Sequence, residues 1–498
     1  MHYQNPILRG FYPDPSICRV EDDYYLVTST FEFSPGVPLF YSKNLVNWTQ
    51  IGYCLDGESA VDLRSCHASG GIYAPTIRYH LGMFYMITTN VGGGGHLICH
   101  TADIRGEWSK PIYIGLPGID PSLLFDGDKV YLSCTGEQEG RSGIFVCEID
   151  PIKGTLLTEP TCVSFGCGGK CPEAPHIYHI GDYYYLMIAE GGTEYGHRET
   201  IMRGASPYGP YTPCPHNPIL FHQERMDSNL HATGHADLVE DTNGNWWLVC
   251  LGIRQLPYVM LHHLGRETFL APVAWQDGWP IVGNQGMIDY EMDAPLPMPA
   301  QATDWNYHDD FSGDMLNLRW SYVRNPEKSM YSLSNGKLHL NAADSLNEEK
   351  GSPAFVGIRQ PEFKINAQAV LYNPNASNLF AGLSVYYNND YHYDLCVQNE
   401  NGQTLVFLRR RVHDMEVCGE IAAFTTDQPL KLGVQADEQS YQFAIETVDG
   451  ERTLLGSGLT AGLCTEGTHT MTFTGVFIGM FSECGTAEFT SFDLAVDE

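Results

Sequence analysis

The sequence predicts an all-β protein in which a five-bladed β-propeller is followed by a β-sandwich. Aromatic, strand-like segments recur five times within the first 290 residues, and no long apolar segment with the helical period interrupts them. The 51 Gly residues fit the many tight turns that such short strands need. A chain of 498 residues is also longer than one ordinary core, so two domains are expected.

The five aromatic segments share one repeat phase. Each follows a turn with Gly or Asp, and each contains one reference aromatic residue: Tyr25, Tyr85, Tyr131, Tyr184 and Trp246. Stepping back 11 residues from these aromatic residues leads to five anchor positions: Asp14, Ala74, Asp120, Glu173 and His235. Further hairpins lie between the anchors, so each unit contains about four strands. Four strands make one propeller blade, and five such units close a propeller.

The anchor positions also predict where four polar side chains lie. The innermost strand of each blade lines the central channel, so Asp14, Asp120, Glu173 and His235 are expected to face one common point. A buried acid that ties blades together through backbone N–H groups would explain any one of these residues. Three carboxyl groups and a histidine at the same phase favour a functional site.

Three carboxyl groups at one point suit the hydrolysis of a glycosidic bond. One group must stay ionised to deprotonate water, and another must stay protonated to donate to the leaving oxygen. Inverting enzymes hold these two groups about 6.5–9.5 Å apart, a gap that different blades can supply. A third carboxylate helps to keep the acid protonated, because like charges raise its pKa.

Short motifs in a fixed order connect the whole chain to a known family. They lie at residues 10–17, 29–32, 42–48, 71–75, 120–123, 173–176, 189–193, 234–236 and 264–268. In this order they resemble glycoside hydrolase family 43, in the branch of β-xylosidases and α-L-arabinofuranosidases that carry a C-terminal β-sandwich.

The resemblance implies a role for each of several residues. Asp14 would be the general base, Asp120 the carboxylate that tunes the acid, and Glu173 the general acid. Arg266 would bind the sugar, and His235 would lie on the propeller axis, where many relatives hold a calcium ion. The chemistry needs no organic cofactor.

Other substrate contacts are expected from aromatic and hydroxyl side chains near the anchors. Phe31, Tyr73 and Thr193 are the candidates in the propeller, although core packing would explain each aromatic residue about as well. Xylosidases similar to this chain often have Trp where Tyr73 stands. The choice between arabinose and xylose therefore stays open.

The second domain is expected to complete the site. Residues 1–292 are assigned to the propeller, the Pro-rich residues 293–305 to a stiff linker, and residues 306–498 to the sandwich. The resemblance implies that the sandwich packs on the active-site rim and extends an aromatic side chain toward it, with Phe477 as the candidate. The alternative is a structural or independent carbohydrate-binding module.

Charge and cysteine content exclude several partners. A net charge of −32 repels phosphate, so neither nucleic acid nor an anionic membrane surface is an expected partner. No apolar run reaches membrane-spanning length, and no secretory signal stands at the N-terminus, so a cytoplasmic location is expected. The 15 cysteines are expected to be free thiols, and the spacing of Cys162, Cys167 and Cys171 does not match a zinc ribbon.

The sequence therefore predicts an exo-acting, inverting glycoside hydrolase that releases terminal xylose or arabinofuranose from hemicellulose-derived oligosaccharides. Two alternatives stay open: a non-catalytic carbohydrate-binding propeller, and a retaining, fructosidase-like enzyme with five blades. The second group begins with Asn-Asp-Pro-Asn, which differs from Tyr12-Pro13-Asp14-Pro15-Ser16 in this chain. Assembly into a homo-oligomer is compatible with the sequence.

Overall fold

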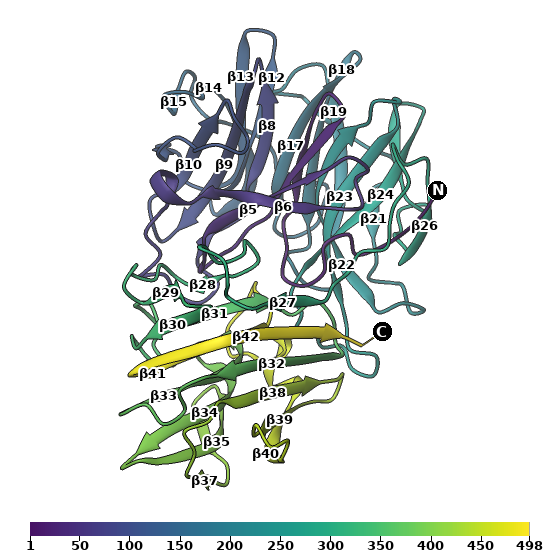
Figure 1. Cartoon of the computed structure of the whole chain (residues 1–498). Coiled ribbons are helices and arrows are strands. Elements are labelled where there is room, and N and C mark those ends of the chain that lie inside the picture. The colour runs from purple at the N-terminus through teal and green to yellow at the C-terminus, as the bar shows by residue number, and fades with distance from the viewer. Residues whose placement is uncertain (498) are drawn as a thin grey trace.

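The chain folds into two all-β domains, as a computed structural model shows. The structure describes residues 1–497, which form 42 strands and three short 3-10 helices, η1 (Gly57–Ser59), η2 (Thr460–Leu463) and η3 (Thr465–Gly467). In Figure 1 the propeller lies above, in purple to teal, and the sandwich lies below, in green to yellow. The predicted fold class is confirmed.

Five antiparallel sheets form the blades, and each is described from the innermost strand outward. Blade 1 contains β2 (Ser16–Val20), β3 (Asp23–Val27), β5 (Gly36–Ser42) and β6 (Thr49–Leu55). Blade 2 contains β8 (Thr76–His80), β9 (Met83–Val91), β10 (Gly95–Thr101) and β11 (Ile112–Tyr113), with β7 (Gly71–Ile72) also paired to β9. Blade 3 contains β12 (Ile119–Asp126), β13 (Lys129–Gln138), β14 (Arg141–Asp150), β15 (Thr155–Leu156) and β16 (Thr161–Ser164).

The last two blades complete the ring. Blade 4 contains β17 (Glu173–Ile180), β18 (Tyr183–Glu190), β19 (Arg198–Gly204), β20 (Thr212–Pro213) and β21 (Leu220–Phe221). Blade 5 contains β22 (Leu230–Glu240), β23 (Trp246–Arg254), β24 (Glu267–Gln276) and β25 (Trp279–Val282). The innermost strands contact one another around the ring, and the contact between β2 and β22 closes it.

The N-terminal segment fastens this closure. Strand β1 (His2–Gln4) pairs with β26 (Glu291–Asp293), which follows blade 5. The Asn5 side chain donates a hydrogen bond to the carbonyl of Leu270 in β24, at 3.0 Å, and accepts one from the N–H of the same residue, at 2.9 Å. The first residues of the chain therefore hold the last blade in place.

The inner strands are irregular where the polar anchors lie. The pairing register shifts between Ile119 and Ser122 in blade 3 and between Glu173 and His176 in blade 4. Blade 5 has register shifts on both sides of Gly234, next to His235. Bulges of this kind bend a strand and re-aim its side chains, which lets the anchors face the axis and not the space between blades.

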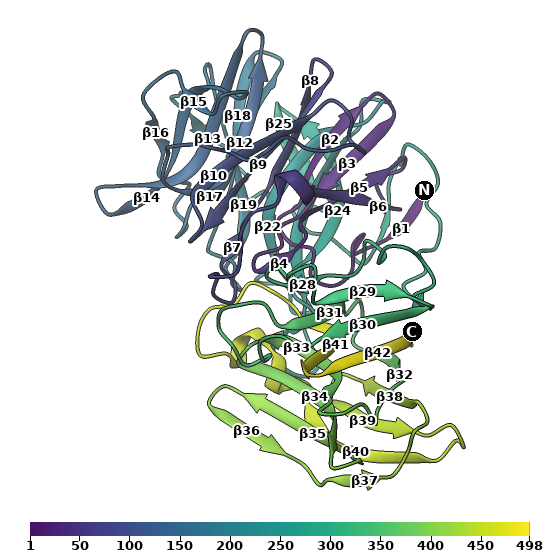
Figure 2. The same cartoon turned by 60° about the vertical axis from the view of Figure 1, so that its left-hand side comes forward.

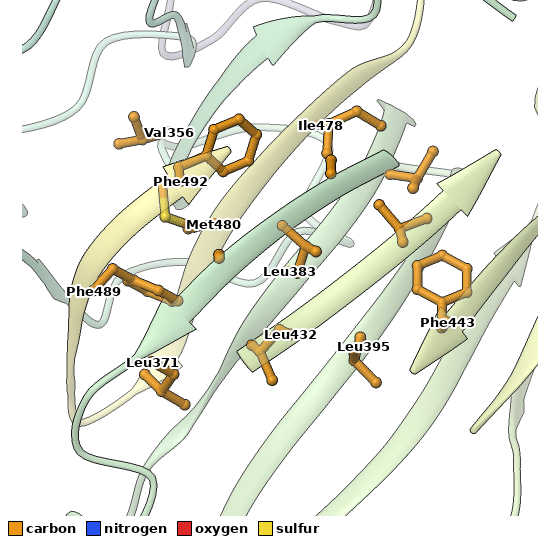
Figure 3. Close-up of a cluster of buried hydrophobic side chains, with 14 of the residues drawn as sticks. Val356, Leu371, Leu383, Leu395, Leu432, Phe443, Ile478, Met480, Phe489 and Phe492 are labelled. Carbon is orange, nitrogen blue, oxygen red and sulfur yellow. The ribbon is translucent and has the colours of Figure 1, made fainter. Parts of the chain in front are cut away.

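The sandwich consists of two antiparallel sheets that enclose one apolar core. One sheet contains β27 (Tyr307–Asp309), β29 (Tyr331–Ser334), β30 (Lys337–Asn341), β32 (Ile365–Leu371), β38 (Leu430–Ala436), β39 (Ser440–Glu446), β40 (Arg452–Leu459) and β42 (Thr486–Val496). The other contains β31 (Ala354–Arg359), β33 (Phe380–Asn388), β34 (Tyr391–Glu400), β35 (Gln403–Val412), β36 (Met415–Cys418), β37 (Ala422–Phe424) and β41 (Phe477–Cys484). Figure 3 shows side chains such as Leu383, Leu432 and Phe489 meeting between the sheets.

The Pro-rich segment between the domains lies against the propeller. Ala294 and Leu296 are buried in the propeller core, and the side chains of Asn44 and Asn47 donate to the carbonyls of Pro299, at 3.1 Å, and Gln301, at 2.8 Å. This segment is therefore held in place by contacts along its length as well as by its prolines.

The two domains share a continuous interface (Figure 2). Strand β4 (Phe33–Ser34) of the propeller pairs with β28 (Tyr322–Val323) of the sandwich. Elsewhere in the interface, buried Arg254 bridges Glu267 of the propeller and Glu362 of the sandwich, each at 2.6 Å. Removing one partner from such a buried network destabilises the fold, because the charge of the remaining partner is left uncompensated.

Two further findings bear on the sequence-based expectations. Each of the 15 cysteines carries a free thiol, as expected. Among residues 1–497 no helix is long and apolar enough to cross a membrane.

Candidate active site

The four polar anchors lie close together where the inner strands of the propeller meet. His235 Nδ1 lies 3.6 Å from Oδ1 of Asp14, and the negative charge of Asp14 acts on both Asp120 and Glu173. Asp14, Asp120 and His235 all have a positive φ, between 50° and 55°, a backbone conformation that residues other than Gly rarely adopt. Such strain at converging polar residues is typical of a functional site.

A buried ionic network adjoins the anchors on the inner strands. Asp237 of β22 accepts hydrogen bonds from Arg78 at 2.7 Å, from Ser16 at 2.6 Å and from Tyr178 at 2.6 Å. These residues come from blades 5, 2, 1 and 4, so one carboxylate ties four inner strands together. Asp237 is thus the tie between blades, whereas the anchor carboxyl groups are available for chemistry.

Asp14 is held in its ionised form. Arg266 donates two hydrogen bonds to its carboxylate, at 2.9 and 3.3 Å, and the Ser29 hydroxyl donates a third. Burial alone would raise the pKa of Asp14, but Arg266, His235 and Ser29 outweigh it, so the pKa lies below its ordinary value. An ionised carboxylate at neutral pH can act as a general base.

Glu173 is in the opposite state. Burial and the charge of Asp14 together raise its pKa to about 7, and Arg266 opposes the increase only in part. Burial and Glu173 likewise raise the pKa of Asp120 well above its ordinary value, so the two carboxyl groups hold on to a proton near neutral pH. Asp120 accepts the N–H of Ala174 at 3.2 Å, which opposes the increase in its pKa only in part. We assign the donated proton to Glu173, because a pKa of about 7 lets a carboxyl group both hold and release a proton near neutral pH.

Arg266 connects the base to the aromatic part of the site. Its guanidinium lies over the ring of Phe31, with 5.4 Å to the centroid, and over that of Phe473, with 5.6 Å. It also donates to the Thr193 hydroxyl at 3.2 Å. Tyr73 adjoins the same group, since its ring centroid lies 5.0 Å from that of Phe31. The structure thus brings Phe31, Tyr73, Thr193 and Arg266 together beside Asp14.

The expected aromatic residue of the sandwich is Phe473 and not Phe477. Phe477 is completely buried and stacks on Phe33, with a centroid distance of 4.1 Å, so it belongs to the domain interface. Phe473 instead stacks on Phe31 at 5.5 Å. Its N–H donates to the Ser69 hydroxyl at 2.9 Å and its carbonyl accepts from Arg266 at 3.4 Å. These bonds fix the sandwich segment against the propeller beside Arg266.

His235 lies beside Asp14, but the residues around it do not form a calcium site by themselves. Burial lowers its pKa to about 4, so the ring is neutral at neutral pH and carries a lone pair. Ca²⁺ takes about six to eight oxygen ligands. Among residues 1–497 no group of three or more His, Cys, Asp or Glu side chains is placed to hold a metal ion. A bound calcium ion therefore stays a prediction and would depend mainly on water ligands.

Two residues of the site escaped the sequence analysis. Ser29 follows strand β3 within a motif that drew attention only to its aromatic neighbours, yet it bonds the base directly. Phe473 lies four residues before β41 begins, in a segment that forms no regular strand. Its only local signal is Gly475, two residues further on, where a Cβ would come within 2.3 Å of the Leu264 carbonyl.

The fold and the site together define a glycoside hydrolase. A propeller and a sandwich enclose an ionised carboxylate and a protonated carboxyl group, the pair that hydrolysis of a glycosidic bond requires.

Comparison with known proteins specifies the family. The sequence profile of glycosyl hydrolases family 43 matches residues 3–280, and that of the beta xylosidase C-terminal concanavalin A-like domain matches residues 308–494. The chain belongs to glycoside hydrolase family 43.

Relatives resemble the chain over nearly its whole length. It is 43% identical to a non-reducing end alpha-L-arabinofuranosidase of Bacteroides ovatus, over 96% of this chain and 91% of the relative. A beta-xylosidase of Bacillus subtilis is 35% identical, over 86% and 84% of the two chains. A solved xylan beta-1,4-xylosidase from Bacillus halodurans superimposes with a TM-score of 0.91 at 31% identity, covering 99% of both chains.

Proposed function

We propose that this glycoside hydrolase releases terminal xylose or arabinofuranose units from hemicellulose-derived oligosaccharides, with inversion of the anomeric centre. The observation that carries the proposal is the opposite protonation of Asp14 and Glu173, which assigns one carboxylate to the water and one acid to the leaving group. The relatives named above act on these two sugars, and they resemble the chain in both domains.

The reaction then needs one concerted displacement. Asp14 takes a proton from water, and the water oxygen bonds to the anomeric carbon as the bond to the leaving oxygen breaks. Glu173 gives its proton to that oxygen. Because the water attacks from the face opposite the leaving group, the configuration inverts. Solvent then removes the proton from Asp14 and returns one to Glu173.

Arg266 has two roles in this scheme. Its positive charge keeps Asp14 ionised, and its remaining N–H groups face the aromatic group and Thr193, where a sugar hydroxyl would lie. Its Nε forms no hydrogen bond within residues 1–497 although it is buried. A planar fork of donors is suited to the hydroxyl groups of one sugar ring.

Phe473 supports action at a chain end. It adds a wall from the sandwich beside Phe31 and Tyr73, where a propeller alone would have an open face. An endo-acting enzyme needs a cleft that is open at both ends, whereas removal of one terminal sugar needs a closed side. The wall therefore favours exo-hydrolysis.

A substrate screen with product analysis tests the proposal. Nitrophenyl glycosides of xylose, arabinofuranose and fructose are compared, and NMR follows the first product formed from each accepted substrate. We expect turnover of β-xyloside, α-arabinofuranoside or both, with α-xylose or β-arabinose formed first. A retained configuration, or turnover of the fructoside alone, would contradict the proposal. Two active substrates should inhibit each other competitively, because one site serves both.

Two further proposals concern the surroundings of the reaction. We propose a reducing, intracellular location, because all 15 thiols are free and most are buried without a partner cysteine. A second proposal concerns a metal ion: we propose that a calcium ion binds weakly near His235. Chelation that leaves both activity and melting temperature unchanged, with no effect of added Ca²⁺, would contradict it.

A further inference from the structure

A completely buried histidine, His197, lies next to the general acid. Its Nε2 is 3.8 Å from Oε1 of Glu173, and its side chain is shielded from solvent. Within residues 1–497 this nitrogen has no hydrogen-bond partner. Buried polar atoms are nearly always paired, so an unpaired one that is aimed at a catalytic group points to a partner it acquires during the reaction.

Hydrogen bonding fixes which ring nitrogen carries the proton. Nδ1 of His197 lies 3.0 Å from the carbonyl oxygen of Ala232, and a carbonyl oxygen can only accept, so the N–H is on Nδ1. Burial lowers the pKa of His197 to about 4, which keeps the ring neutral near pH 7. A neutral ring protonated on Nδ1 has a lone pair on Nε2. This lone pair faces the carboxyl group of Glu173.

Two glycines set the position of the ring: one shapes the loop that carries His197, and the other leaves room for the ring itself. His197 ends a tight loop that begins at Gly191, where φ is +95° and a Cβ would lie 2.0 Å from the Gly196 carbonyl oxygen. The ring itself occupies the space next to Gly234, where a Cβ would approach its Cε1 to 2.7 Å and its Nδ1 to 2.9 Å. Gly234 belongs to the bulge of β22 that also presents His235. The ring position is thus coupled to the geometry of the site.

We propose that His197 is a positioning residue for the general acid: its Nε2 accepts a hydrogen bond from the protonated Glu173 carboxyl group between turnovers. The inference rests on the proposed role of Glu173 as the acid. A small rotation of the Glu173 side chain brings the two atoms within bonding distance, and catalytic hydrogen bonds are often long when no substrate is bound. A bond that requires the neutral carboxyl group favours the form that can donate a proton.

The proposed step conserves protons. When the sugar binds, the carboxyl group turns from Nε2 toward the leaving oxygen and gives up its proton there, while Asp14 takes a proton from water. His197 neither gains nor loses a proton. The Glu173 carboxylate that remains then faces a lone pair, an unfavourable contact that promotes the return of a proton from solvent before the next turnover.

Two substitutions at this position separate the proposed role from packing. In His197→Asn the amide nitrogen keeps the bond to Ala232, but the side chain is too short to reach Glu173. In His197→Gln the longer side chain presents an amide oxygen to Glu173. Each variant is assayed on xylobiose and on 2,4-dinitrophenyl β-xyloside, or on the corresponding arabinofuranosides, because the dinitrophenolate leaving group needs little protonation. The pH profile of kcat/KM and the melting temperature are recorded for both.

We expect His197→Asn to lower kcat on the disaccharide roughly ten- to a hundred-fold and on the aryl glycoside less than about threefold. The basic limb of the pH profile should move to lower pH, because Glu173 loses a partner that favours its protonated form. His197→Gln should restore most of the loss. Equal losses on both substrates, or an unchanged limb with an unchanged rate on the disaccharide, would overturn the proposal.

Two controls keep the test decisive. If His197→Asn does not fold, Gly234→Ala displaces the ring by another route and should cause the same loss on the disaccharide alone. A folded Gly234→Ala protein that loses activity equally on both substrates would overturn the proposal. Glu173→Gln is measured in parallel. If that variant shows no dependence on the leaving group, the assignment of the acid fails, and this failure is distinguishable from failure of the role of His197.

Discussion

The floor and the wall of the active site are built in different ways. The floor residues Asp14, Asp120 and Glu173 occupy equivalent positions on three blades, and inner strands that are bulged or strained present them. The wall residue Phe473 comes from an irregular segment, residues 471–476, that three hydrogen bonds hold against the propeller, to Ser69, Arg266 and His263. A repeated backbone geometry thus positions the carboxyl groups, whereas a single segment docked on the propeller forms the boundary of the pocket. The floor should therefore control turnover, and the wall should control which substrates fit.

The largest expected effect lies in the floor. Asp14→Asn should lower kcat roughly 10²- to 10⁴-fold on every substrate, because water activation is lost. Glu173→Gln should cause a similar loss on a disaccharide but a much smaller one on an aryl glycoside. Steady-state kinetics on both substrates check this, with circular dichroism as the control for folding. Near-normal rates for both variants on the disaccharide would mean that the floor does not perform the chemistry.

Arg266 joins floor and wall, and its loss should be the next largest effect. Arg266→Ala should lower kcat/KM roughly ten- to a hundred-fold, since a hydrogen bond to a charged group contributes about 1.5–3 kcal/mol. Loss of its charge should also raise the pKa of Asp14, so the acid limb of the pH profile moves to higher pH. Arg266→Lys keeps the positive charge but lacks the planar set of guanidinium donors. It should therefore bring the acid limb back toward its original pH more fully than it restores kcat/KM. An unchanged acid limb would show that Arg266 does not control the pKa of Asp14.

The pH profile tests the floor without any substitution. Glu173 has a pKa of about 7 and must be protonated, so kcat/KM should be retained below pH 7 and fall about tenfold for each unit above it. Because Asp120 and Glu173 titrate together, the apparent value belongs to the pair. Asp120→Asn removes the like charge, so the basic limb should shift to lower pH. A profile that rises through pH 8 would contradict the assignment of Glu173 as acid.

The smallest expected effect lies in the wall. Phe473→Ala should raise KM by roughly tenfold or less, with little change in melting temperature, because one side of the pocket is lost. Phe477→Ala is the matched control: it should destabilise the fold by about 3–5 kcal/mol through loss of core packing and keep the KM of the folded protein. If the two variants exchange these behaviours, the wall has been assigned to the wrong phenylalanine.

The sequence predicts the floor of the site better than its wall. The floor residues could be predicted from the repeat, because one spacing recurs five times and every blade has the same geometry. Phe473 was missed because β41 begins only at Phe477. The segment before it is pressed onto the propeller backbone at Leu264, a contact between residues far apart in the chain. Alternation of apolar residues cannot reveal such a contact.

Other parts of the site were hidden for a related reason. Ser29 bonds Asp14 from the segment after β3, and His197, at the end of a glycine loop, lies 3.8 Å from Glu173. Neither position belongs to the repeat, and neither spacing matches a known ligand pattern. Their importance comes from burial and from partners on other blades, which the order of residues does not specify. For His235, spacing predicted that it meets Asp14 but could not supply ligands for an ion.

The left-handed backbone at the floor sets a limit on how this enzyme adapts to heat. Asp14, Asp120 and His235 each hold a conformation that costs a residue with a side chain roughly 1–2 kcal/mol, and Gly would relieve that cost. Selection for thermal tolerance alone would therefore replace the residues that make the protein an enzyme. Variants that resist heat and remain active should carry their changes elsewhere, for example in the sandwich core or at the ion pairs between the domains.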